Sequence, residues 1–196
     1  MGNKNDYLRW SRKRISIEMN FFSLYLSLAL LTRSILCSRR IIGGYQINIT
    51  DAPFTVSIQL NGKHYCGGAL ITKEFVLSAG HCIETKGGDF KARLGSTFNN
   101  KFGLNVNIEK MMKHPNYDDN YLDYDFGLFQ LSKIENIPEL AGFATLPSDN
   151  KDPKDGEVTF VAGWGVTENE ENVEILRGVL VPIVERKKCR ESFSLE

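Results

Sequence analysis

The stretch FVLSAGHCIE, residues 75–84, places His81 directly before Cys82 at the end of an apolar run. Two small residues, Ala79 and Gly80, separate the pair from that run. Histidine titrates near neutral pH, and cysteine can bind a metal or form a disulfide. Three chemistries therefore fit the pair: a metal site, a core histidine beside a disulfide, or a catalytic base held near a covalent cross-link.

Four side chains of types that bind zinc occur in this region: His64, Cys66, His81 and Cys82. One residue separates the first pair and none separates the second. Structural zinc sites usually leave roughly two to four residues between paired ligands, so that the chain can fold around the ion. The sequence therefore predicts no metal site, and His64 by itself is expected to be a solvated side chain.

A histidine that follows an apolar strand is often packed in a core, and this is the favoured interpretation of His81 taken alone. A catalytic base also needs a buried carboxylate that fixes the ring tautomer and stabilises the imidazolium. The segment NYLDYDFGLFQLS offers Asp123 and Asp125, and Asp125 begins an apolar strand. Because a charge at the mouth of a buried strand is costly unless paired, Asp125 is the better candidate partner. Asp118, Asp119 and Asp123 are expected to be loop carboxylates.

The charge of the chain is asymmetric, although its formal net charge is zero. Residues 1–40 carry eight Lys or Arg and two acidic residues, whereas the remainder carries 16 basic and 22 acidic residues. The acidic remainder argues against a nucleic-acid-binding protein, which usually presents a basic face. The basic segment precedes an apolar run, residues 21–31, which is about half as long as a membrane-spanning helix.

A basic segment followed by a short apolar run predicts a secretory signal peptide within residues 1–37. The protein is therefore expected to be secreted and extracellular, with no stable membrane anchor. A buried core helix and an uncleaved signal anchor stay open as alternatives. Met19 begins a workable signal by itself, so residues 1–18 need not belong to the product.

Secretion changes how the cysteines are interpreted, because the compartment is oxidising. A disulfide between Cys66 and Cys82 is then the default. Closing a loop of 16 residues contributes about 3 kcal/mol in the chain-entropy estimate. Outside the cytosol, the sequon Asn48-Ile49-Thr50 also becomes a candidate glycosylation site at Asn48.

Apolar residues after position 40 recur with a period of two. The segment FTVSIQLN alternates apolar and polar side chains, which predicts a half-buried antiparallel strand. Asn61-Gly62 predicts a hairpin turn after it. Further short strands are predicted at HYCGGALI, FVLSA, KARLG, NVNIEKM, DFGLFQL, EVTFVAG and LRGVLVPIV. This pattern predicts an all-β barrel or sandwich.

The polar segment 147–157 indicates a connection between two β units, and residues 185–193 have helical composition.

Six motifs occur in a fixed order between residue 40 and the end of the sequence. They are RIIGGYQ (40–46), CGGALI (66–71), SAGHC (78–82), DYDFGLFQL (123–131), VAGWGVT (161–167) and LRGVLVPIVERKKC (176–189). In this order they resemble the chymotrypsin/trypsin-like serine proteases, and most of all a secreted animal enzyme of the trypsin type, such as that of an arthropod. The resemblance implies two antiparallel six-stranded β-barrels, the second of them incomplete. The peptidase domain would span residues 41–196, with the first barrel at about 41–134 and a linker and partial second barrel at about 135–196.

The resemblance also assigns roles to individual residues. His81 would be the general base, Asp125 its orienting carboxylate, and the Cys66–Cys82 disulfide would lie beside the histidine. The family usually shows TAAHC where this chain has SAGHC, so Gly80 is expected to remove a methyl group and little else.

Members of this family are made as zymogens that are cleaved after a basic residue. The corresponding bond here is Arg40–Ile41, which would make residues 38–40 a short propeptide. The freed ammonium group of Ile41 would pair with an aspartate beside the nucleophilic serine, and a buried charge of this kind requires such a partner. An ordinary dibasic processing site at Arg39-Arg40 predicts the same cut.

The family's nucleophile lies in a GDSGGP motif that this sequence does not contain. Ser192 and Ser194 lack the flanking glycines that a strained turn with backbone oxyanion donors requires. They are expected to be ordinary helix or tail residues, and the 196-residue chain is expected to be inactive for lack of a catalytic serine. Residues 99–105 carry no carboxylate, so no calcium site is expected there, and no cofactor is implied.

Two hypotheses about function follow from the resemblance. In the first, the sequence is a fragment of a secreted serine endopeptidase that acts on protein or peptide substrates and binds protease inhibitors. In the second, it is a truncated, inactive homologue that acts as a binding protein. The residues of the specificity pocket are absent, so a preference for cleavage after Arg or Lys rests only on the trypsin-like appearance.

Overall fold

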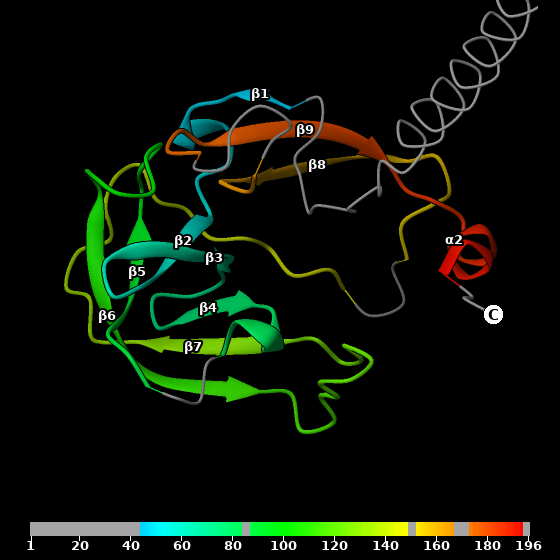
Figure 1. Cartoon of the computed structure of the whole chain (residues 1–196). Helices are drawn as coiled ribbons and strands as arrows, with labels where there is room; N and C mark the ends of the chain where they lie inside the picture. The colour runs from blue at the N-terminus through cyan, green and yellow to red at the C-terminus, as the bar shows by residue number, and fades with distance from the viewer. Residues whose placement is uncertain (1–43, 84–86, 149–151, 167–172, 194–196) are drawn as a thin grey trace, which may run out of the picture. The chain divides into compact units, whose positions relative to one another are not determined.

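The structure is a computed structural model that describes residues 44–83, 87–148, 152–166 and 173–193 (Figure 1). The predicted signal peptide (1–37), the propeptide (38–40), the bond Arg40–Ile41 and Ser194 lie outside the described residues. Among the helices of the described part, none is long and apolar enough to cross a membrane.

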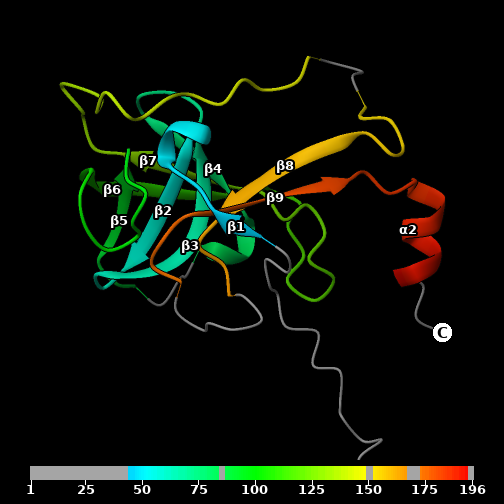
Figure 2. The same cartoon turned by 90° about the horizontal axis from the view of Figure 1, so that it is seen from above.

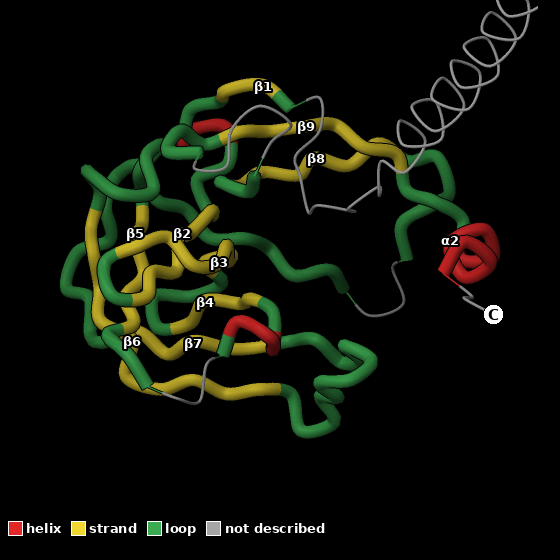
Figure 3. Tube along the Cα trace, in the orientation of Figure 1, coloured by secondary structure: helices red, strands yellow, loops and turns green. Residues whose placement is uncertain are grey.

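Six antiparallel strands form a closed barrel in the order β2-β3-β4-β7-β6-β5. Their bounds are β2 (Thr55–Leu60), β3 (Lys63–Leu70), β4 (Phe75–Ser78), β5 (Phe90–Leu94), β6 (Leu104–Lys113) and β7 (Gly127–Leu131). Figure 3 shows far more strand than helix in the described chain, as predicted. The barrel encloses a core of aliphatic and aromatic side chains that includes Ile58, Val76 and Phe129, each fully buried.

A second, three-stranded antiparallel sheet has the order β1-β9-β8, with β1 at Tyr45–Gln46, β8 at Val158–Gly163 and β9 at Arg177–Pro182. This sheet is the partial second barrel, so the predicted fold class is confirmed. The α-helix α2 (Arg186–Phe193) follows β9 and agrees with the helical composition of that segment (Figure 2). The strand β1 has only two residues, too few for a period of two to reveal it in the sequence.

The turn after β2 forms as predicted. Leu60 pairs with Lys63 across Asn61 and Gly62, whose φ angles are 51° and 78°. Two successive positive φ angles are the requirement of the tight hairpin turn for which Asn-Gly is the preferred pair.

The prediction that β2 is half-buried is wrong, because the strand is buried on both faces. Its polar residues Ser57 and Gln59 are 0% and 1% exposed. Gln59 Nε2 donates to the carbonyl of Asn99 at 2.6 Å, and Asn99 Nδ2 donates to the carbonyl of Val173 at 2.9 Å. Other parts of the chain therefore cover this face and satisfy the hydrogen bonds of Gln59, as buried polar groups generally require, whereas Thr55 Oγ1 is buried without a hydrogen-bond partner among the described residues.

Candidate active site

The candidate site lies where two neighbouring strands of the barrel meet. The strand β4 leads into a single turn of 3-10 helix, η2 (Gly80–Cys82), which carries His81. Asp125 lies two residues before β7, and Ser78 at the end of β4 pairs with Gly127 at the start of β7. Because the two strands are antiparallel neighbours, residues just beyond these ends come together although 44 positions separate them in the sequence.

Asp125 binds His81 through both carboxylate oxygens. The His81 backbone N–H donates to Oδ1 at 2.8 Å, and ring Nδ1 lies 2.7 Å from Oδ2. Because an ionised carboxylate only accepts hydrogen bonds, the ring proton of a neutral His81 is placed on Nδ1, which leaves the lone pair on Nε2. The side chains of His81 and Asp125 are 34% and 25% exposed, so the pair is partly shielded from solvent without being sealed off.

Opposing effects act on the pKa of Asp125. Desolvation by burial is the largest and raises it, whereas hydrogen bonds from the ring and backbone of His81, its charge, and the backbone N–H of Gly80 lower it. The lowering effects win, so the pKa of Asp125 lies below its ordinary value and the carboxylate is ionised near neutral pH. An ionised partner is what a histidine needs in order to stabilise its own positive charge.

The predicted disulfide between Cys66 and Cys82 is present, with the two Cα atoms 6.2 Å apart. It ties the end of η2 to β3, a strand that also pairs with β4. Ligand atoms of Cys66, His81 and Cys82 lie within 4.8 Å of one another, the nearest approach to a metal cluster among the described residues. Since the two sulfur atoms are bonded to each other, neither is available as the thiolate that a zinc site requires.

His64 differs from the prediction of a solvated side chain. Its Nδ1 is hydrogen-bonded to Ser57 Oγ at 2.8 Å, and its ring meets that of Trp164 edge-on, with centroids 5.7 Å apart. Desolvation by burial lowers the pKa of His64 to about 4. Trp164 directly follows β8 of the second sheet, so the alternation within β3 gave no sign of this environment.

The remaining acidic residues of the 114–126 loop, which joins β6 to β7, accept hydrogen bonds from other groups of the same loop. Asp118 Oδ1 accepts from the N–H of Asn120 at 2.8 Å, and Asp119 Oδ1 accepts from the hydroxyl of Tyr117 at 2.8 Å. Asp123 Oδ1 accepts from the next backbone N–H at 2.9 Å. They are loop carboxylates, as predicted, and Asp125 alone among the four binds His81.

Two further predicted positions lie away from this pair. Ser192 is in α2, and its hydroxyl donates to the carbonyl of Lys188 one helical turn earlier at 2.9 Å. Asn48 is exposed, and its Oδ1 accepts from the N–H of Thr50 at 3.3 Å as the cap of a 3-10 turn, η1 (Ile49–Asp51).

One neighbour of the pair has no counterpart among the predicted site residues. A Cβ atom added at Gly80 would lie 3.0 Å from Cδ2 of Tyr117 and 3.1 Å from the carbonyl oxygen of Phe126. The space left by the missing methyl group is thus filled, so the expectation that Gly80 changes little else is wrong. The only signal in the sequence was the departure of SAGHC from TAAHC.

Comparisons with known proteins agree with this geometry. The family model described as Trypsin matches residues 41–195. Over 158 residues the chain is 33% identical to Trypsin 5G1 of Aedes aegypti, which covers 80% of this chain and 59% of that protein. It is 32% identical over 157 residues to the vitellin-degrading protease of Bombyx mori, covering 79% of this chain and 60% of that protein. The chain thus spans about three fifths of the length of these curated relatives.

A solved structure with the same fold is that of a scabies mite inactivated protease paralogue. It matches with a TM-score of 0.72 and 25% sequence identity, over 78% of this chain and 66% of that one. The barrel, the disulfide and the histidine–aspartate pair are therefore accompanied by sequence similarity over most of residues 41–195. The chain belongs to the trypsin family of serine proteases.

Proposed function

We propose that this chain carries the base half of a serine endopeptidase site, with His81 as general base and Asp125 as its orienting carboxylate. The observation that carries the proposal is the double hydrogen bond from the ring and backbone of His81 to one carboxylate. It holds the ring in one orientation and leaves Nε2 as the basic nitrogen.

In the proposed reaction, Nε2 of His81 takes the proton of a serine hydroxyl as the hydroxyl oxygen attacks the peptide carbonyl. The same proton then passes to the leaving amine, while Asp125 stabilises the imidazolium in between. The sequence contains no GDSGG motif, so we assign no nucleophile within its 196 residues. The substrates would be proteins or peptides, and protease inhibitors would compete for the same site.

The proposal includes secretion after removal of a signal peptide and activation by cleavage between Arg40 and Ile41. It includes a glycan on Asn48 as well, since that side chain is exposed. Cleavage specificity of the trypsin type, after Arg or Lys, is supported by the relatives named trypsin.

A fluorophosphonate probe, which reacts with activated serines, tests the reaction. The 196-residue chain is compared with the same chain extended by the coding sequence that follows Glu196 in the gene. Labelling is expected only of an extended chain that contains the GDSGG motif, and His81→Ala should abolish it. Labelling of a specific serine in the 196-residue chain, or no labelling of a folded extended chain, would overturn the proposal.

A second candidate function is that of a catalytically inactive binding protein. The observation in its favour is the structural match to a protease paralogue described as inactivated. The presence of both His81 and Asp125 in hydrogen-bonding geometry argues against a long-standing loss of activity. A stop codon directly after Glu196 in a complete transcript, together with binding of a protease inhibitor by the unlabelled chain, would favour this alternative.

A further inference from the structure

The aromatic ring of Tyr117 packs directly against the backbone of the helical turn that carries His81. A Cβ atom at Gly80 would lie 3.0 Å from Cδ2 and 3.3 Å from Cε2 of this ring. A larger residue here would therefore require the ring to move away from η2 by a few tenths of an ångström. Gly80 has no positive φ angle, so the need for glycine here arises from the close contact and not from the backbone conformation.

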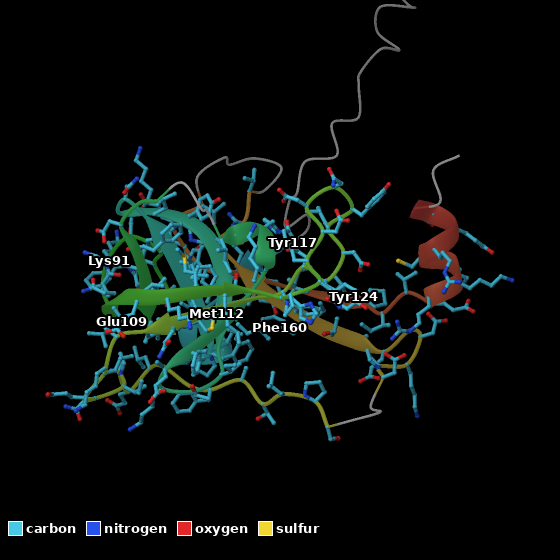
Figure 4. The ribbon with its side chains drawn as sticks, turned by 90° about the horizontal axis from the view of Figure 1, so that it is seen from below. Lys91, Glu109, Met112, Tyr117, Tyr124 and Phe160 are labelled. Atoms are coloured by element: carbon cyan, nitrogen blue, oxygen red, sulfur yellow. A yellow bond between two sulfur atoms is a disulfide. The ribbon has the colours of Figure 1, made fainter. Side chains whose placement is uncertain are left out.

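Three other contacts hold Tyr117 in this position. Its backbone N–H donates to the carbonyl of His114 at 3.0 Å, and its hydroxyl donates to Asp119 Oδ1 at 2.8 Å. The ammonium group of Lys113 lies 4.6 Å from the ring centroid, a favourable cation–π distance. Figure 4 shows Tyr117 in the loop close to η2. The ring is thus fixed from the side of the loop before it meets Gly80.

The same loop carries Asp125. The two ends of the loop are tied by the His114 N–H, which donates to the carbonyl of Phe126 at 2.9 Å. That carbonyl oxygen would itself lie 3.1 Å from a Cβ atom at Gly80. The loop therefore rests on Gly80 at two points, the Tyr117 ring and the Phe126 backbone, on either side of the carboxylate that binds His81.

We propose that Tyr117 is a positioning residue. Its ring packs the 114–126 loop against Gly80 and so keeps Asp125 within hydrogen-bonding distance of the ring and backbone N–H groups of His81. Tyr117 touches no reacting atom and acts through Asp125. Its importance for catalysis rests on the proposed function, whereas its effect on the geometry of the pair does not.

The test follows the proton between Nδ1 of His81 and Asp125 by NMR, using the full 196-residue chain. The sequence holds three histidines, so their ring signals can be assigned by single substitutions. In Tyr117→Ala, the packing of the ring against Gly80 is lost. The exchange rate of this proton with water should then rise by about tenfold, because the loop opens locally more often. Tyr117→Phe keeps the ring, so its exchange rate should stay within about twofold of the wild type.

A double-mutant cycle separates positioning from simple loss of stability. Gly80→Ala alone should speed exchange, because the new methyl group would displace the Tyr117 ring by a few tenths of an ångström. Once Tyr117→Ala has removed the ring, adding Gly80→Ala should increase exchange less than it does in the wild type, because only the contact with the Phe126 carbonyl oxygen remains. Such non-additivity is the mark of directly coupled residues. The ring signals of His64, which lies in a different part of the barrel, report whether each variant is folded.

Two results would overturn the proposal. One is an exchange rate in folded Tyr117→Ala within twofold of the wild type, and the other is independent addition of the Gly80→Ala and Tyr117→Ala effects. Neither measurement requires hydrolysis. Failure of the fluorophosphonate labelling would therefore count against the proposed function and leave the positioning role of Tyr117 intact.

Discussion

The burial of His64 predicts a specific loss of stability in mild acid. Desolvation lowers the pKa of this ring from 6.5 to about 4 in the folded protein. His64 therefore binds a proton more readily in the unfolded chain than in the folded protein. The free energy of unfolding falls as the pH drops below 6.5, and the contribution of His64 to this loss is complete below about pH 4. A difference of about 2.5 in pKa corresponds to roughly 3 kcal/mol, of which about 2.5 kcal/mol is lost between pH 7.5 and 4.5.

The assay is urea unfolding of the wild type and of His64→Gln at several pH values in this range, followed by tryptophan fluorescence. Trp164, whose ring contacts His64, is buried and should report the transition. Carboxylates also titrate as the pH falls, and Lys63 and Glu174 line the same cavity as His64. These groups are present in both proteins, so the difference between the two stability curves isolates the histidine.

The expected result is that the stability of the wild type falls more steeply towards pH 4.5, by about 2.5 kcal/mol relative to the variant. An NMR titration of the His64 ring gives an independent check and should show a midpoint well below 6. Parallel stability curves, or a His64 midpoint near 6.5, would refute the argument that burial keeps this ring neutral.

Three further predictions concern the site and its surroundings. The double substitution Cys66→Ala and Cys82→Ala should lower the free energy of unfolding in urea by about 3 kcal/mol, from the loop of 16 residues; a loss below about 1 kcal/mol would contradict it. When the chain is secreted from eukaryotic cells, Thr50→Ala should remove a glycan, seen as a mass shift, yet leave the Asn48 cap in place; an unchanged mass would exclude modification of Asn48. In the extended chain, Asp125→Asn should lower kcat about 10⁴-fold, the size known for this change in a trypsin-like enzyme, because an amide favours the wrong tautomer of the histidine; a loss below tenfold would contradict the assigned role.

Asp125 could be singled out in the sequence because the signal for it is local, although its partner lies 44 positions away. A carboxylate that begins an apolar strand needs a partner, and a histidine at the end of another apolar strand can supply one. The eight predicted strands and the Asn61-Gly62 turn were likewise visible, since period-two alternation and turn chemistry act over a few residues. These features depend little on which distant segments pack against them.

Apart from the short strand β1, the features that were missed depend on segments far apart in the sequence. Ser57 and Gln59 look solvent-facing within β2, but Gln59 is hydrogen-bonded to Asn99, which is itself hydrogen-bonded to Val173. His64 is enclosed in part by Trp164, 100 positions away in the sequence. The contact between Gly80 and Tyr117 likewise joins two loops that only the pairing of β4 with β7 brings together.

The histidine–aspartate pair is built entirely by the first barrel. His81 and Asp125 extend from β4 and β7, which pair directly, and the disulfide fastens η2 to β3 on the other side of β4. A closed barrel has no free edges, so this arrangement does not need the second sheet to complete its backbone hydrogen bonds. A base without a nucleophile performs no hydrolysis, however well it is oriented. The barrel can therefore hold the pair in working geometry whether or not a serine is supplied, and for this reason the geometry of the pair and the activity of the protein have to be tested by separate experiments.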